Sequence, residues 1–313
     1  MRFRPPNDPS GTKSGRIGTA LPHSSFDGNP DSSHADAVCI SAALFDELLV
    51  TPDYVTARAD IIDGIRAFRV WTRLGWQEVK RRYRRTFFGP FWATLSIGAF
   101  IGGMVFVWAP LFKTDVTSYL PFLSAGLVSW TFATALISEG CGTYTAGVAL
   151  ITQLKFPYTV LNFMVVWRNV IVFFHNLVIV VIVVIALRIP VTWQTLLLFP
   201  GIIIVAVNGA WMTILFGMVS ARFRDVPPLV GNIIQILMFV TPIFWFSSQL
   251  GPGAQPIIQY NFMYHLVEVM RSPMLGTAPT LRSYAFTIAG AIVGWLVTFD
   301  LYARFRRRIP YWL

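Results

Sequence analysis

The ionisable residues that could carry out acid–base chemistry are scattered along this chain. An enzyme that transfers or hydrolyses groups needs convergent acids, bases or metal ligands. Here Glu139, Glu268 and Asp300 lie near the ends of long apolar stretches, and His175 has no carboxylate close to it in sequence. This distribution offers no catalytic residue, and we predict that the chain is not an enzyme.

The cysteines and histidines do not have the spacing of a metal site. The two cysteines, Cys39 and Cys141, lie far apart and match no metal-binding pattern. The four histidines are scattered as well, at His23, His34, His175 and His265. We therefore expect two unpaired structural thiols and no bound metal.

A glycine-rich phosphate-binding loop is also missing from the sequence. The pattern G-x-x-x-x-G-K-[ST], whose backbone cradles nucleotide phosphates, does not occur, and "GTKSG" at Gly11 lacks its spacing. We expect no cofactor in this chain. Any dependence on ATP and Mg²⁺ would have to come from a partner subunit that binds them.

The composition places the chain in a membrane. Of its 313 residues, 55% are hydrophobic and only 13% are charged, and the mean hydropathy is +0.58. A soluble domain usually carries about 25% charged residues. Several uncharged runs reach the roughly 20 apolar residues that a bilayer-crossing helix needs, and the alternation typical of outer-membrane barrel strands is absent. The sequence predicts an all-α integral membrane protein.

Six stretches have the length and apolarity of membrane spans. We predict them at residues 89–112, 119–138, 156–187, 196–219, 230–246 and 284–302. The third stretch is longer than one bilayer crossing, so we expect its first part to lie at the membrane surface. Pro227 and Pro228 mark the start of the fifth span.

The segment between the fifth and sixth spans, residues 247–282, combines helix breakers with an apolar run. It contains Pro252, Pro256 and Pro273, together with the sequence "IIQYNFMYHLVEVM". That run is too short to cross a bilayer and suits a re-entrant segment, which must be shielded by protein or line a wet cavity. We predict a pair of short helices that dip in from the outer side.

Residues 61–87 have the periodicity of an amphipathic helix. One face carries apolar and aromatic side chains, namely Ile61, Ile65, Phe68, Trp76, Val79 and Tyr83. Another face is basic, with Arg66, Arg69, Arg73, Lys80, Arg81 and Arg84. Such a helix, placed just before an apolar span, favours a position at the membrane surface over simple packing on a soluble partner.

The first 60 residues differ in composition from the rest of the chain. They are rich in Pro, Ser, Gly and Asp and lack the pattern of a secretory signal. We expect a disordered cytoplasmic extension over residues 1–60, with at most a short helix at 42–50. Residues 61–313 would then form the transmembrane domain.

The orientation follows from the distribution of basic residues between the spans. Basic residues gather before span one and after spans two, four and six, at Arg81, Arg82, Arg84, Arg85, Lys155, Arg222, Arg224, Arg304, Arg306, Arg307 and Arg308. The other loops carry only Lys113, Arg188, Arg271 and Arg282. We predict that both termini are cytoplasmic. This asymmetry also accounts for the net charge of +10 without nucleic-acid binding.

Three segments together resemble a known family. "RRYRRTFFGPFW" (residues 81–92) resembles the start of the first span in type-2 ABC exporter permeases, and "ARFRDVPPL" (221–229) resembles the loop after their fourth span. "NFMYHLVEVMRSPMLG" (261–276) is similar to their outer re-entrant segment, with Phe262 where the family commonly has proline. The chain is most similar to membrane subunits of O-antigen and capsular polysaccharide exporters (Wzm and KpsM types) over residues 61–313.

This resemblance implies partners and a substrate. Members of the family form a homodimer in the bacterial inner membrane, with a channel between the protomers and a separate cytoplasmic ATPase. Their substrate is a glycan on a lipid anchor. A small-lipid or drug exporter of the same ABC type is the alternative. A secondary transporter is disfavoured because internal repeats with broken helices are absent.

The resemblance also assigns the ATPase contact to the loop after span two, residues 139–153. We expect a short surface helix there, with side chains available at Glu139, Thr143, Tyr144, Thr145 and Thr152. The alternative is a helix that merely connects two spans.

The basic cluster before span one could recruit the anionic lipid anchor. Guanidinium groups bind phosphate bidentately, and Arg81, Arg82, Arg84 and Arg85 would be held at headgroup depth. The alternative is that these arginines only enforce topology and attract anionic lipid.

Aromatic and polar side chains within the spans could line a conduit for sugars. Aromatic rings pack against the C–H faces of sugars, and a conduit needs many weak contacts. The channel-lining candidates are Trp92, Arg168, His175, Asn176, Phe239, Phe244, Tyr260 and Tyr264, with Trp108, Trp130, Asn169 and Trp245 nearby in the spans. Two alternatives are open, because the tryptophans could form interfacial belts and Arg168 could extend to the inner membrane surface.

Overall fold

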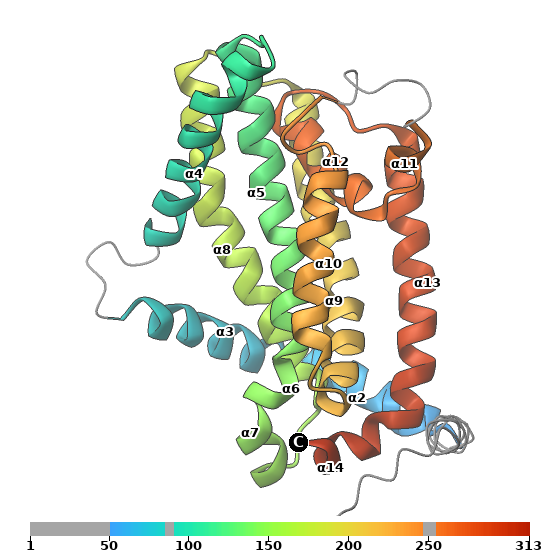
Figure 1. The fold of residues 1–313 in the computed structure, drawn as a ribbon. Helices are drawn as coiled ribbons and strands as arrows, with labels where there is room; N and C mark the ends of the chain where they lie inside the picture. Colours follow the sequence, from blue (N-terminus) through green and yellow to red (C-terminus); the bar gives the residue numbers. More distant parts are fainter. Residues whose placement is uncertain (1–50, 85–90, 247–254) are drawn as a thin grey trace, which may run out of the picture. The chain divides into compact units, whose positions relative to one another are not determined.

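A computed structural model describes residues 51–84, 91–246 and 255–313, and a ribbon drawing is shown in Figure 1. The chain divides into two units, Met1–Val50 and Thr51–Leu313, and the described residues all belong to the second. The predictions for residues 1–50, including the helix at 42–50, lie outside the described part, as does Arg85. Within the described part every regular element is a helix.

Five helices are long and apolar enough to cross a membrane. They are α4 (Phe91–Leu111), α5 (Val116–Cys141), α8 (Thr159–Ala186), α9 (Leu198–Arg222, extended by the 3₁₀ turn η1, Trp193–Leu197) and α13 (Leu281–Phe305). They match the predicted spans one to four and six. The third predicted span is one continuous 28-residue helix with no break near its start.

The fifth predicted span is α10 (Val226–Val240), which has only 15 residues. At a rise of 1.5 Å per residue it is roughly 22 Å long, less than the roughly 30 Å of a bilayer core. The helix ends early because Thr241 precedes Pro242, and a residue before proline is pushed out of the helical region. The backbone of Thr241 is accordingly extended, with ψ 132°. The prediction of six full-length spans is therefore supported for five of them.

Helix α5 is at the centre of the described unit. It packs against α8 and α9 along most of its length, and against α12. Most of its side chains are buried, among them Leu123, Val128 and Leu136. Helix α13 is the opposite case, because Ile292, Leu296 and other large apolar side chains on it are exposed. Exposed apolar side chains on a long helix are what a lipid environment favours.

Close packing of α5 on α9 depends on glycines. A Cβ added to Gly140 would lie 2.9 Å from the Cα of Thr213, and one added to Gly217 would lie 3.0 Å from the carbonyl oxygen of Gly140. Small residues let membrane helices approach closely enough for backbone contact. The glycines at these positions therefore fix the distance between the two helices.

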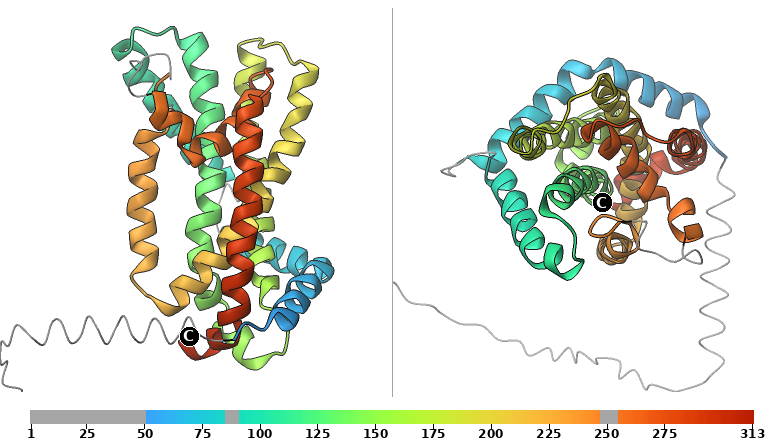
Figure 2. Two further views of the ribbon diagram at one scale, coloured as in Figure 1. Left: turned by 90° about the vertical axis from the view of Figure 1, so that its right-hand side faces the viewer. Right: turned by 90° about the horizontal axis from the view of Figure 1, so that it is seen from above.

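The amphipathic segment forms two helices, not the single helix predicted for residues 61–87. Helix α2 (Tyr54–Arg66) and helix α3 (Phe68–Tyr83) meet at Ala67, whose ψ of 28° lies outside the helical range. Both helices pack on α8, and Figure 2 (right) shows them following its outer side as an arc. The bend brings both Gly64 and Gly75 against α8, where an added Cβ would meet Thr159 and Trp167.

The burial of side chains on α2 and α3 agrees only partly with the predicted apolar face. Val79 is buried, whereas Ile65, Phe68 and Trp76 are exposed. Burial follows the glycine face that contacts α8, so the exposed apolar side chains remain available to a membrane. Their depth in a bilayer stays a prediction.

The predicted domain boundary at residue 60 differs from the structure. Helix α2 begins at Tyr54, capped by the side chain of Asp53, which accepts a hydrogen bond from the backbone N–H of Thr56 at 3.1 Å. Residues 54–60 are thus part of the helical unit. Composition did not reveal this, because residues 54–60 mix polar and apolar side chains and contain no long apolar run.

The remaining short helices lie at the two ends of the bundle. Helices α11 (Gln255–Tyr260) and α12 (Phe262–Met274) form the predicted pair between α10 and α13. At the opposite end lie α6 (Thr143–Ala146), α7 (Val148–Gln153), the 3₁₀ turn η4 (Arg306–Arg308) and α14 (Ile309–Trp312) (Figure 1). Whether α11 and α12 enter the membrane from outside remains a prediction.

Candidate functional site

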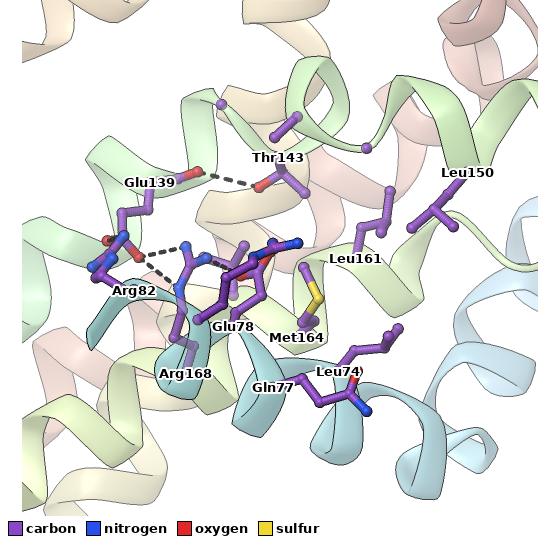
Figure 3. A pocket seen from close by; sticks show the side chains of 15 residues that line it. Leu74, Gln77, Glu78, Arg82, Glu139, Thr143, Leu150, Leu161, Met164 and Arg168 are labelled. Atoms are coloured by element: carbon purple, nitrogen blue, oxygen red, sulfur yellow. Dashed lines mark hydrogen bonds and ion pairs between the residues drawn. The ribbon is translucent and has the colours of Figure 1, made fainter. Parts of the chain in front are cut away.

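A cavity of about 550 Å³ opens where α3, the end of α5, α6, α7 and the first turns of α8 meet (Figure 3). It is lined by Leu74, Gln77, Glu78, Arg81, Arg82, Glu139, Gly142, Thr143, Ala146, Gly147, Leu150, Leu161, Met164, Val165 and Arg168. The cavity therefore joins the loop predicted to contact an ATPase with the basic end of the amphipathic segment.

Beside this cavity lies a network of charged and polar side chains, which we call the Glu139 cluster: Glu78, Arg82, Glu139, Arg168 and Asn169. Oε2 of Glu139 accepts from Nη2 of Arg168 at 2.6 Å and from Nδ2 of Asn169 at 2.7 Å. Its Oε1 accepts from Arg82 at 3.0 Å. Arg168 also donates to Glu78. Glu139, on the last turns of α5, is thus bound to α3 and α8 at once (Figure 3).

The charges in the Glu139 cluster balance. Two carboxylates face two guanidinium groups, and hydrogen bonds between ionised partners are among the strongest in proteins. Arg168 is largely buried, with 13% of its side chain exposed. Its guanidinium is occupied by Glu139 and Glu78, a role that neither sequence interpretation of Arg168 anticipated. The partner Glu78 could not be foreseen, because it belongs to a surface helix far away in sequence.

The loop residues predicted to contact an ATPase divide into two groups. Thr145 and Thr152 are exposed. Thr143 is buried, and Tyr144 is completely buried at 0% exposure. The expectation that all of these side chains are available for contacts is wrong for Thr143 and Tyr144.

The burial of Tyr144 has a clear cause. Its ring fills the second apolar cluster of the unit together with Leu161, Ile214 and Met218, and it lies against Gly217. Burial raises the pKa of its phenol far above the usual value. Tyr144 therefore fixes α6 to α8 and α9, and the surface of the loop is formed by its exposed neighbours, including Leu150 and Leu154.

A second polar cluster, centred on Asp60, was missed in the sequence. Asp60 is 4% exposed and accepts hydrogen bonds from the backbone N–H groups of Tyr158 (3.1 Å) and Thr159 (3.2 Å) at the start of α8. It also accepts from the hydroxyl of Tyr302 (2.7 Å) and from Arg306 (2.5 Å). We call these residues the Asp60 cluster. A carboxylate with this many donors is fully satisfied despite its burial.

Further polar contacts reinforce the joint between α2 and the end of α13. Asp53 pairs with Arg307 at 2.5 Å, and Tyr54 donates to Asp300 at 2.7 Å. Hydrogen bonds from the hydroxyl and the backbone N–H of Thr56 lower the pKa of the Asp53 carboxyl, and Arg307 lowers it further. The start of the described unit is thus held to its end.

The arginines predicted to recruit a lipid anchor are not equivalent. Arg81 pairs with Glu78 at 3.3 Å, and Arg82 belongs to the Glu139 cluster. Arg84 is exposed at the end of α3, and Arg85 lies outside the described residues. All three described arginines are therefore exposed, but Arg82 also has a structural partner that sequence alone did not indicate.

The channel-lining candidates do not come together at one place. On α8, Asn176 is buried and accepts from Thr94 of α4 at 3.2 Å, while Nδ1 of His175 donates to the backbone carbonyl of Ile171 at 2.8 Å. Among the aromatic candidates, Phe244 is buried and Tyr264 is half-buried, whereas Trp92, Phe239 and Tyr260 are exposed.

Two of the aromatic candidates, Phe239 and Phe244, lie together with two tryptophans near the end of α10. The ring centroids of Phe239 and Phe244 are 6.4 Å apart, and the ring of Trp108 lies 6.5 Å from Phe244. The indole of Trp245 donates to the carbonyl of Phe239 at 3.2 Å. Trp130 is buried in the core, which removes it from a predicted interfacial belt.

The described unit is that of a multi-pass helical membrane protein. Comparison with known families makes this specific, because residues 69–275 match the ABC-2 type transporter family. The match runs from α3 to the end of α12, covers well over half of the chain and includes every residue that lines the cavity beside the Glu139 cluster. This chain belongs to the ABC-2 type transporter family.

Individual relatives are more distant. The chain is 24% identical over 170 residues to the O-antigen export system permease protein RfbA of Myxococcus xanthus, an alignment that covers 54% of this chain and 65% of that protein, slightly under two thirds. It is also similar to proteins of the same name from Klebsiella pneumoniae, at 23% identity over 191 and 189 residues, covering 59% of this chain and 72% of each.

Proposed function

We propose that this chain is the membrane subunit of an exporter that moves a lipid-linked polysaccharide, an O-antigen or a capsule polymer, across the inner membrane. The observation that carries the proposal is the family membership together with relatives that are named O-antigen export permeases. The subunit would work as a homodimer with a channel between the protomers. ATP and Mg²⁺ would be bound by a separate ATPase subunit.

The arrangement of the Glu139 cluster supports a route by which an ATPase could act on the membrane helices. Helices α6 and α7 expose Thr145, Leu150 and Thr152 at one end of the bundle. They follow directly after Glu139, which is bound to Arg82 of α3 and to Arg168 of α8. A partner that pushes on α6 and α7 would therefore move three helices together. Closely packed helices move as units because their packing is not continuously deformable. A displacement of α6 and α7 would therefore reach α3, α5 and α8.

The distribution of basic residues supports a cytoplasmic location for this end. Arg81, Lys155, Arg222 and Arg307 belong to elements and loops at the end that holds α6, α7 and α14. Basic residues are enriched in cytoplasmic loops. Both termini would then face the cytoplasm, and α11 and α12 would face the outer side.

The outward-facing arginines at the end of α3 support a contact with the phosphate of the lipid anchor. Arg81 and Arg84 are exposed there, and guanidinium groups match phosphate geometry better than lysine does. Replacing Arg81, Arg82, Arg84 and Arg85 by lysine would keep the charge. Normal export by that variant would leave these arginines a purely electrostatic role.

Copurification tests the proposal as a whole. Full-length protein, expressed with the genes beside its own, should bring down an ATPase whose activity rises with the lipid-linked glycan. Deletion of the gene should remove the surface polysaccharide, and the wild-type gene should restore it. An ATPase stimulated by small lipids or drugs, with unchanged surface polysaccharide after deletion, would identify a different ABC-2 exporter.

A further inference from the structure

A separate cavity of about 560 Å³ lies in the elbow between α2 and the long helices α9 and α13. Figure 2 (left) shows α2 extending away from the foot of α13. Ile61 and Ile62 of α2 form one wall, and Trp295 and Phe299 of α13 form the other. Every lining residue is apolar except Arg58. Neither the family assignment nor the proposed transport reaction gives this crevice a role.

Arg58 is the only charged group among the described residues that line the crevice. It precedes Ile61 and Ile62 by three and four positions, so all three side chains share one face of α2. Arg58 is exposed, and among the residues that the structure describes it makes no hydrogen bond or ion pair. Nearby arginines differ, because Arg306 pairs with Asp60 and Arg307 pairs with Asp53.

The walls of the crevice continue along α13 into its lipid-facing surface. Ile292, Trp295 and Phe299 recur at helical spacing on one face, over roughly 10 Å of helix. Next to them, Leu296 is 66% exposed. Apolar cavities do not hold water well, so in a bilayer the natural occupant is hydrocarbon.

A second copy of this chain fits the crevice less well than a lipid does. Stable protein interfaces use about 20–30 residues on each side, whereas nine of the described residues line the crevice. A single acyl chain needs only a narrow apolar slot. Its headgroup would lie at the level of α2, where Arg58 offers an exposed guanidinium.

We propose that this crevice is a binding site for an anionic phospholipid, with one acyl chain against α13 and the headgroup phosphate bound by Arg58. The lipid would brace α2 against α13 from the side opposite the buried Asp60 face of α2. The Asp60 cluster holds one face of α2, and the lipid would contact the other. Membranes that contain more anionic lipid would therefore hold the amphipathic segment more firmly against α13.

Photolabelling tests this site directly. Full-length protein is placed in phosphatidylcholine vesicles that contain a minor fraction of phosphatidylglycerol and a trace of either lipid with a diazirine on its acyl chain. We expect the phosphatidylglycerol probe to label α2 and the 292–299 segment of α13 about fivefold more than the phosphatidylcholine probe, the factor that corresponds to about 1 kcal/mol for one basic residue near an anionic surface. Equal labelling by both probes would overturn the proposal.

Variants separate the site from general attraction to the membrane. Arg58→Gln should abolish the preference for phosphatidylglycerol without changing the unfolding temperature, because Arg58 is exposed. Arg66→Gln, at the end of the same helix and weakly paired with Asp63 at 3.9 Å, should leave the preference intact. Equal losses in both variants would mean that α2 attracts anionic lipid without a specific site.

Two further outcomes identify other occupants. A polyprenyl phosphate that displaces the probe, when the same amount of unlabelled phosphatidylglycerol does not, would assign the crevice to the lipid carrier of the substrate and overturn the phospholipid assignment. Disulfide linkage of two copies through Leu296→Cys, without lipid labelling, would assign it to a second copy and overturn the proposal entirely.

Discussion

Asp60 and Arg306 lie 246 positions apart in sequence and are joined by two hydrogen bonds, at 3.0 Å from Nε and 2.5 Å from Nη2 of the arginine. The carboxylate is almost completely buried, with 1% of its side chain exposed. This pair connects the first described helix with the turn that follows the last long helix. The ring of Tyr158 lies beneath the guanidinium at 4.8 Å, so the pair also fixes the start of α8.

We predict that Asp60→Ala destabilises the protein by about 3–5 kcal/mol, the range found when one partner of a buried ion pair is removed. The substitution leaves Arg306 and the backbone N–H groups of Tyr158 and Thr159 without their acceptor. Unfolding of the detergent-solubilised protein measures the change. Asp63→Ala, which removes an exposed pair on the same helix, should cost less than about 0.5 kcal/mol. Similar losses in both variants would contradict the burial of Asp60.

The Glu139 cluster gives a prediction about coupling. Glu139→Gln removes the charge that balances Arg82 and Arg168, and we expect a loss of roughly 2 kcal/mol, below the value for a fully buried pair because Glu139 is partly exposed. In the complex with its ATPase, ATP hydrolysis should continue while export falls. The two rates, measured in the same vesicles, check this. Asp225→Asn, an exposed carboxylate between α9 and α10, is the matched control and should change neither rate.

The two groups of loop residues predict opposite behaviour. A glutamate at Thr145 or Thr152 changes only the surface of α6 and α7, so export should drop while the unfolding temperature stays the same. Tyr144→Ala removes a fully buried ring and should cost about 3–5 kcal/mol. Export assays together with thermal unfolding separate the two effects. Normal export by the Thr145→Glu and Thr152→Glu variants would exclude this loop as the ATPase contact.

The long helices could be predicted from the sequence because they depend on local composition. A run such as 159–186 is mostly apolar, and bilayer thickness then sets the minimum length of the helix. The length of α10 was the exception. The apolar residues after Pro242 led the sequence analysis to extend the span to residue 246, although Pro242 ends the helix before Thr241. The bend at Ala67 was not predictable either, because it depends on how Gly64 and Gly75 meet α8.

The partners of polar residues could not be predicted from the sequence. Asp60 and Arg306 are at opposite ends of the described unit, and Glu78, Glu139 and Arg168 come from three different helices. The sequence places Arg168 in a long apolar stretch, but the identity of the element that faces it needs tertiary structure. The burial of Tyr144 was missed for the same reason, since a polar loop of short helices gives no periodic signal.

His265 gives a prediction about pH. Its Nε2–H donates to the carbonyl of Gln259 at 3.0 Å, and its Nδ1 lies 3.0 Å from the hydroxyl of Ser283, so the ring joins α11, α12 and α13. Burial lowers the pKa of His265 below its ordinary value of 6.5, Arg282 lowers it further, and the Gln259 carbonyl and Glu268 act against this.

A histidine whose pKa is lowered by folding stabilises the fold above the unfolded-state pKa, and this contribution is lost as the pH falls through the lowered value. The unfolding temperature should therefore decrease from about pH 7 to about pH 5. His265→Asn should be less stable at neutral pH and should lose part of this pH dependence. An unchanged slope in the variant would show that His265 is not the group responsible.

Alanine should have different effects at two glycines, because Gly294 lies at the contact between α9 and α13 and Gly103 lies in open space on α4. A Cβ on Gly294 would lie 2.2 Å from the indole of Trp211, whose Nε1 donates to Asn208 at 3.1 Å. Gly294→Ala must displace this ring, and overpacking of this kind costs about 1–3 kcal/mol. Gly103 of α4 has no atom within 4 Å of an added Cβ, so Gly103→Ala should be neutral or stabilise by up to about 1 kcal/mol through the higher helix propensity of alanine. Of the two variants, measured in one detergent, Gly294→Ala should thus have the clearly lower unfolding temperature. A Gly294→Ala variant as stable as Gly103→Ala would contradict the close approach of α13 to α9 at Trp211.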